Sequence, residues 1–89
     1  MAYEKNEIEN VVAVIPQTEF TELRITEIGN NGKIECIDVR QWYCTSKNPI
    51  KSPTQKGIRV SVESLPTLLS AIMNCLGDEF KQKVLRNIL

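Results

Sequence analysis

A strong turn signal between two alternating stretches limits what this chain can fold into more than any other feature. Residues 29–32 read Gly-Asn-Asn-Gly, and both residue types tolerate the positive φ angles that tight hairpin turns require. On either side, residues 20–28 and 33–43 alternate apolar and polar side chains, which is the pattern of a half-buried strand. The sequence therefore predicts a β-hairpin.

The alternation slips early in the second of these strands. Ile37 and Val39 have one parity and Asp38 has the other, but the apolar Cys36 falls on the polar parity. Two explanations are open, a bulge near Glu35 or a strand whose two faces are both partly covered.

Two further segments extend the hairpin into a meander. Val11–Ile15 is a β-branched run ended by Pro16, which predicts a short edge strand or a segment that docks on a partner. The preceding residues 1–10 are polar and are expected to be loose. Residues 44–55 are rich in Ser, Thr, Asn, Lys and Pro and predict a loop, and residues 57–62 predict another strand.

The last third of the chain changes to a helical period. Ser61 or Ser64 can cap a helix, Pro66 fits only in its first turn, and Gly77 is expected to end it. Asp78 can cap a second, shorter helix that runs to the C-terminus. The apolar face of the first helix consists of Leu65, Leu68, Leu69, Ile72, Met73 and Leu76.

These segments predict an α+β fold, with an antiparallel four-stranded sheet, a C-terminal helix and a short extra terminal helix. A chain of 89 residues has few places to bury two apolar helical faces. The economical solution is a homodimer whose interface is the apolar face of the first helix, and the alternative is a monomer whose helix folds on its own sheet. The predicted organisation is an acidic segment 1–19, a domain 20–76 and an extra helix 77–89.

Composition excludes several function classes. The chain has no histidine, which removes Ser/His and Cys/His catalytic pairs and histidine-containing zinc motifs. Cys36, Cys44 and Cys75 form no Cys-x-x-Cys pair, so they predict neither a zinc knuckle nor a disulfide framework. The longest apolar run, Val11–Ile15, is far shorter than the roughly 18 residues of a membrane span. We expect a soluble cytoplasmic protein with no metal, no cofactor, no membrane partner and no enzymatic activity.

The formal net charge is zero, and such a total does not indicate a nucleic-acid-binding protein. The charges are unevenly distributed, because residues 1–23 carry net −4, residues 24–59 carry net +4 and residues 60–89 balance. Charges farther apart than roughly 8–10 Å are largely screened, so the basic middle can act as a local anion site. The alternative is a solvated sheet face with ordinary surface lysines.

Two motifs lie in this basic middle. Ile37–Tyr43 reads Ile-Asp-Val-Arg-Gln-Trp-Tyr, Pro53–Ile58 reads Pro-Thr-Gln-Lys-Gly-Ile, and the loop between them holds Lys47 and Lys51. Together they resemble the single-stranded-DNA-binding core of the positive cofactor four family of transcriptional coactivators, over about residues 23–72. The resemblance implies a strongly curved sheet whose ridges bind unpaired DNA and a dimer held through its helices.

The resemblance also assigns roles to residues. It implies that Arg40 and Lys56 contact phosphates or base edges and that a neighbouring aromatic ring stacks on bases, which single-strand binding requires. Trp42 and Tyr43 are adjacent and face opposite ways, so we expect one of them to pack in the core. Arg40 could instead pair with Asp38, and Arg59 is a weaker candidate. The predicted nucleic-acid-binding residues are Arg24, Lys33, Arg40, Trp42, Tyr43, Lys51, Lys56 and Gly57.

The chain departs from the family between Lys33 and Ile37, where it has about one residue more, and at Gln55, where relatives carry a second cation. Its compact form looks like that of a bacterial or phage member, which would be nucleoid-associated in a bacterium.

The functional prediction is a single-stranded DNA-binding homodimer that acts in transcription, with RNA and the transcription machinery as further candidate partners. The alternative is a protein-interaction module that uses the sheet or the last helix, whose apolar stripe includes Phe80, Leu85 and Ile88.

Overall fold

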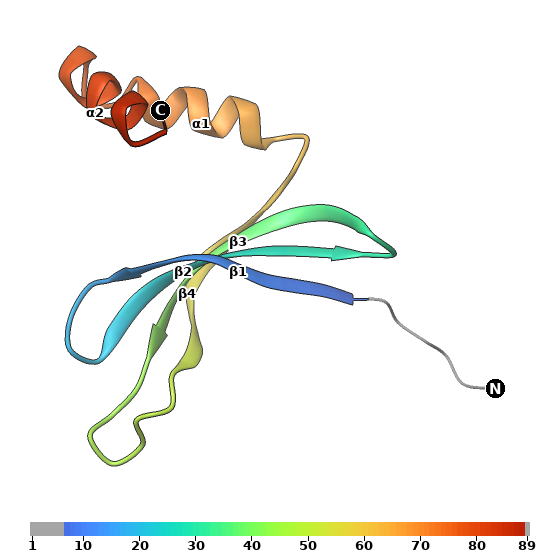
Figure 1. Ribbon diagram of the computed structural model, residues 1–89, viewed down its shortest axis with the longest axis vertical. Helices are drawn as coiled ribbons and strands as arrows, with labels where there is room; N and C mark the ends of the chain where they lie inside the picture. The colour runs from blue at the N-terminus through green and yellow to red at the C-terminus, as the bar shows by residue number, and fades with distance from the viewer. Residues whose placement is uncertain (1–6, 89) are drawn as a thin grey trace.

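The structure, a computed structural model, describes residues 7–88 as an antiparallel sheet followed by two helices (Figure 1). Neighbouring strands in the sheet follow chain order, and the predicted meander and α+β class are confirmed. The elements are β1 (Glu7–Pro16), β2 (Thr21–Asn30), β3 (Lys33–Tyr43), β4 (Ser52–Ser61), α1 (Leu65–Met73) and α2 (Asp78–Ile88).

The predicted hairpin is formed by β2 and β3. Asn31 and Gly32 have φ angles of 53° and 79°, and they connect the paired residues Asn30 and Lys33. Two consecutive positive φ angles match the twist of the flanking strands, so this short turn lets the two strands pair directly up to its ends.

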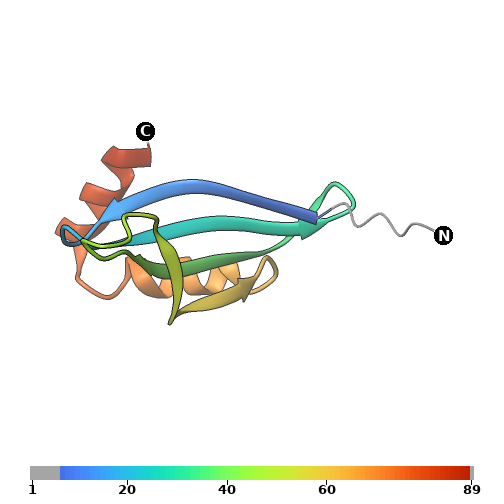
Figure 2. The same cartoon turned by 90° about the horizontal axis from the view of Figure 1, so that it is seen from below.

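Bulges interrupt three of the strands and twist the sheet. In β3, Cys36 pairs with Ile28 and Ile34 pairs with Gly29, so Glu35 is the extra residue. This decides between the two explanations of the slipped alternation in favour of a bulge. Further irregularities occur in β1 near residue 12 and in β4 at residues 54–56. The strands accordingly cross one another in a twisted fan, and they bow when seen from below (Figures 1 and 2).

Two strand boundaries differ from the prediction. β1 begins at Glu7 instead of Val11, because its polar residues pair with β2 as regularly as the apolar ones. Part of the segment expected to be loose therefore belongs to the sheet, while residues 1–6 lie outside the described residues. β4 begins at Ser52 within the predicted loop, and the Thr54 hydroxyl fixes this start by donating to the backbone oxygen of Gln41 at 2.8 Å.

The first helix is shorter than its apolar spacing predicts. It ends at Met73, Asn74 is its C-cap, and Gly77 with φ 85° follows three residues later and precedes α2. Ser64 occupies the N-cap position, but its side chain makes no capping hydrogen bond to the helix. Leu76 therefore lies in the connection between the two helices.

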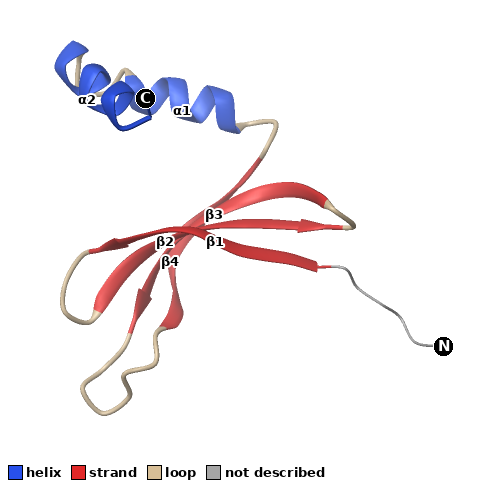
Figure 3. Cartoon of the chain, viewed as in Figure 1, coloured by secondary structure: helices blue, strands red, loops and turns tan. Residues whose placement is uncertain are grey.

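The two helices pack against each other and stand apart from the sheet (Figure 3). As a result, no apolar side chain within residues 7–88 is buried, and the buried polar or charged residues are Thr26 and Asp38. Neither helix is long and apolar enough to cross a membrane. The expectation that Trp42 or Tyr43 packs in a core is wrong, since Trp42 is half-buried and Tyr43 is exposed.

Candidate nucleic-acid interface

The strand register divides the sheet into two chemically different faces. Thr26, Asp38 and Arg59 align across β2, β3 and β4, and Arg24 aligns with Arg40. Residues aligned across neighbouring strands point to the same side, so these side chains share one surface, the polar face. The opposite, apolar face carries Ala13, Ile15, Leu23, Ile25, Ile37, Val39, Ile58 and Val60.

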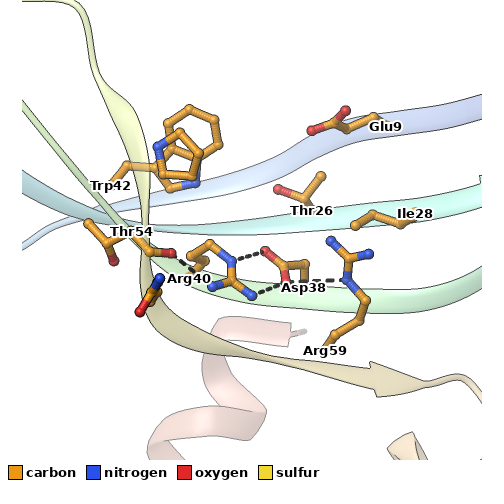
Figure 4. Close-up of a pocket in the computed structure, with 10 residues that line it drawn as sticks. Glu9, Thr26, Ile28, Asp38, Arg40, Trp42, Thr54 and Arg59 are labelled. Carbon is orange, nitrogen blue, oxygen red and sulfur yellow. Dashed lines mark hydrogen bonds and ion pairs between the residues drawn. The ribbon is translucent and has the colours of Figure 1, made fainter.

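Asp38 lies at the centre of the polar face and is 5% exposed. Arg40 donates from Nε and Nη2 to its two carboxylate oxygens at 3.1 and 3.0 Å, and Arg59 Nε lies 3.5 Å from Oδ1 (Figure 4). Arg40 also donates from Nη1 to the backbone oxygen of Thr54 at 2.8 Å. A guanidinium held by three hydrogen bonds has a fixed position and orientation.

The charge of Arg40 is secured by the same contacts. Hydrogen bonding to Asp38 raises the pKa of Arg40, against a smaller opposing effect of desolvation. These bonds use three of the five N–H donors of the guanidinium, and one N–H on each terminal nitrogen is left for a ligand.

A second charge cluster lies beside the first, around Glu22. Lys51 Nζ donates to Glu22 Oε1 at 2.8 Å, and Arg24 Nε donates to Glu22 Oε2 at 2.6 Å. The hydrogen bonds from Lys51 and then from Arg24 lower the pKa of Glu22. The carboxylate therefore stays ionised at neutral pH and holds two of the predicted binding cations.

Trp42 contacts the second of these clusters through Arg24. It lies on the polar face in register with Glu22, and the guanidinium carbon of Arg24 lies 4.1 Å from the centre of its ring. A cation–π contact of this kind contributes on the order of 1 kcal/mol and holds the ring in place.

The predicted binding residues do not all meet on this face. Arg24, Arg40 and Trp42 come together there, and Lys51 reaches them through Glu22. Tyr43 does not, because it follows Trp42 in the strand and points to the opposite side, where it is 47% exposed.

The remaining predicted residues lie at the ends and edge of the sheet. Lys33 is exposed at the β2–β3 turn, several residues along the strand from Arg40. Lys56 is exposed in the irregular part of the edge strand β4. Gly57 pairs with Arg40, and a Cβ placed on it would come within 2.8 Å of the Arg40 backbone. Its missing side chain thus allows β3 of the same chain to approach closely.

Sequence reasoning missed one important residue, Glu22, and gave too little weight to Arg59. Glu22 has the same strand parity as Arg24, a usable signal, but its second partner, Lys51, is 29 residues away in sequence. Arg59 pairs with Asp38 across strands, which depends on a register that sequence patterning does not supply.

A groove of about 420 Å³ crosses the polar face above the Asp38 cluster. Figure 4 shows Trp42 toward one end and Arg59 toward the other, with the Asp38–Arg40 pair between them. The lining residues are Glu9, Thr26, Ile28, Asp38, Arg40, Trp42, Pro53, Thr54, Gln55 and Arg59.

Within residues 7–88, no three His, Cys, Asp or Glu side chains gather in a way that could hold a metal ion. The three cysteines are free thiols. Searches with the sequence and the structure found no matching protein-family model, curated protein or solved structure.

Proposed function

We propose that this protein is a non-enzymatic, single-stranded-DNA-binding homodimer that acts as a transcription cofactor or regulator. The observation that carries the proposal is the grouping of Arg24, Arg40 and Trp42 on the polar face of the sheet. Sequence-tolerant binding of single strands needs cations for phosphates and a flat ring on which bases stack. The resemblance of residues 23–72 to the positive cofactor four family supports the same reading.

The charge arrangement supports modest affinity with a strong dependence on salt. Arg40 and Arg59 are paired with Asp38, and Arg24 and Lys51 are paired with Glu22. A phosphate that takes up one of these cations must compete with a carboxylate already present. Lys56 at the edge of the sheet makes no ion pair among the described residues and is available to a phosphate without such competition.

The homodimer is supported by the apolar surface that one chain leaves open. Leu69 and Ile72 of α1 are 56% and 44% exposed, and Ile58 on the apolar face is 55% exposed. A small domain cannot gain enough hydrophobic stabilisation with this surface in water. A second copy that packs on the helices and the apolar face supplies the missing burial and leaves the polar faces of both chains open.

The test is a titration of the full chain with fluorescently labelled oligothymidine, followed by anisotropy at several salt concentrations. We expect saturable binding, with a log–log slope of affinity against salt of about −0.7 per neutralised phosphate. Unlabelled duplex DNA of the same length should compete poorly. An RNA strand of the same length shows whether the protein distinguishes ribose from deoxyribose.

Two variants localise the binding. Arg40→Ala and Lys56→Ala should each weaken binding, and Lys56→Ala should also reduce the salt slope by about 0.7 for every phosphate that it no longer neutralises. Lys83→Ala is the matched control, since it removes the same charge from an α2 side chain that is 69% exposed. No binding at low salt, or binding that does not weaken as salt rises, contradicts the proposal.

A protein-interaction module is the second candidate, favoured by the exposed end of α2. Leu85 and Ile88 are 47% and 72% exposed on that helix. Removal of residues 78–89 distinguishes the two. Retained DNA binding and dimerisation with loss of a co-purifying protein favours interaction, whereas aggregation means that α2 covers apolar surface in the dimer.

A further inference from the structure

We propose that the groove on the polar face binds one nucleobase of the DNA strand, a guanine, stacked on Trp42 with its O6 and N7 acceptors toward Arg40. This inference rests on the proposed function, because it names the base that the same face selects. It is carried by the charge balance of the groove, its hydrogen-bond donors and the position of Trp42.

The charge balance of the groove favours a base over a phosphate. Four charged side chains line it, and the carboxylates of Glu9 and Asp38 offset the guanidinium groups of Arg40 and Arg59. A groove without net charge attracts a phosphate weakly, whereas a neutral ring with polar edges loses little by entering it. Its volume of about 420 Å³ is in the range of small-ligand sites, roughly 300–1,000 Å³.

The part of the groove around Asp38 presents donors, because Arg40 and Arg59 both line it there. The Asp38 side chain is 8% exposed and its carboxylate is engaged by Arg40 and Arg59, so a base that enters at this point of the groove meets guanidinium N–H groups before the Asp38 oxygens. Arg40 retains one N–H on each terminal nitrogen. Guanine presents two adjacent acceptors, O6 and N7, whereas the corresponding edge of adenine presents one acceptor and one donor.

Trp42 provides the stacking surface. Arg24 covers one side of the ring at 4.1 Å, but Arg24 does not line the groove and Trp42 does. The part of the indole that is turned to the groove is therefore open to a base. A base stacked there would extend an existing pair of flat groups, the guanidinium and the indole.

The test uses oligothymidine of one length with a single central substitution: guanine, 7-deazaguanine, adenine or an abasic site. We expect guanine to bind about fivefold or more tightly than adenine, because the adenine edge cannot accept both hydrogen bonds from Arg40. 7-Deazaguanine, which lacks the N7 acceptor, should fall between them, and the abasic strand should bind most weakly. Equal affinity for guanine and adenine overturns the inference.

Two neighbouring residues give a matched pair of variants. Trp42→Ala should abolish the preference for guanine while salt-dependent binding of the strand remains, and Tyr43→Ala on the opposite face should keep the preference. A preference that survives in Trp42→Ala or disappears in Tyr43→Ala contradicts the proposed groove.

The outcomes separate this inference from the proposed function. If the unsubstituted oligothymidine fails to bind, the proposed function itself fails. If it binds with the expected salt slope but all four substituted strands bind equally, only the base-selective groove is disproved.

Discussion

The two faces of the sheet are built from the same four strands, and they satisfy their side chains in different ways. On the polar face, Asp38 and Glu22 each hold two cations, and Asp38 is buried within a single chain. On the apolar face, Ile15 and Ile58 remain 50% and 55% exposed. One face is completed by contacts within the chain, whereas the other is left open.

The two faces differ in what is needed to stabilise their side chains. Ion pairs and hydrogen bonds on the polar face form between neighbouring strands and need no second layer. Apolar side chains gain free energy only when another surface removes them from water, and both helices stand apart from this sheet. The polar face therefore satisfies its charged groups within one chain, while the apolar face is left exposed to water, and it is there that the proposed second copy would pack.

The largest expected effect comes from placing a charge on the apolar face. Ile58→Asp should destabilise the protein by about 3 kcal/mol or more, because the dimer would bury an unpaired carboxylate. Ile50→Asp is the matched control in the β3–β4 loop, where the side chain is 74% exposed. Sedimentation velocity and urea unfolding measure both effects, and equal stability of the two variants would show that the apolar face stays open.

On the polar face, Asp38 and Arg59 belong to one ion-pair cluster but should contribute differently to the free energy of unfolding. Asp38→Ala should cost about 2 kcal/mol of unfolding free energy, because it leaves the hydrogen-bonding groups of half-buried Arg40 without their acceptor. Arg59→Ala should cost less than about 0.5 kcal/mol, since its side chain is 57% exposed and lies 3.5 Å from the carboxylate. Urea unfolding curves at neutral pH provide the comparison, and a larger cost for Arg59→Ala contradicts this ranking.

Much of the fold follows from local sequence signals. The Gly-Asn-Asn-Gly turn predicts the hairpin because Asn31 and Gly32 must adopt positive φ angles, whereas the slipped parity left two explanations open and only the strand register places the bulge at Glu35. The start of β4 at Ser52 was missed, because its polar residues resemble a loop and its pairing depends on a bond from Thr54 to a distant strand. Local propensity carries no information about such a contact.

The polar face was predictable in part. Strand parity alone puts Arg40 and Trp42 on one side and Tyr43 on the other. It does not reveal that Glu22 binds both Arg24 and Lys51, since that contact joins residues from separate segments. The sequence therefore predicted Arg24 and Lys51 as binding cations but missed the carboxylate that pairs with both of them.

Whether this carboxylate competes with DNA can be measured directly. Glu22→Gln should increase the affinity for oligothymidine about two- to fivefold at low salt, because it removes the negative charge that holds Arg24 and Lys51 in partly buried ion pairs. Glu63→Gln is the matched control, an exposed carboxylate with no ion pair among the described residues. Unchanged binding by Glu22→Gln would show that the carboxylate does not compete with DNA, and weaker binding would mean that it positions these cations for DNA.

The smallest effect concerns the stability of the same cluster in acid. Hydrogen bonds from Lys51 and Arg24 lower the pKa of Glu22 in the folded chain below its ordinary value of 4.5. A lowered folded pKa gives a stability contribution that is present above 4.5 and is lost as the pH falls through the folded value. The parent should therefore lose slightly more urea resistance than Glu22→Gln between about pH 6 and about pH 3. Parallel losses in the two proteins would show that Glu22 gains nothing from Lys51 and Arg24 on folding.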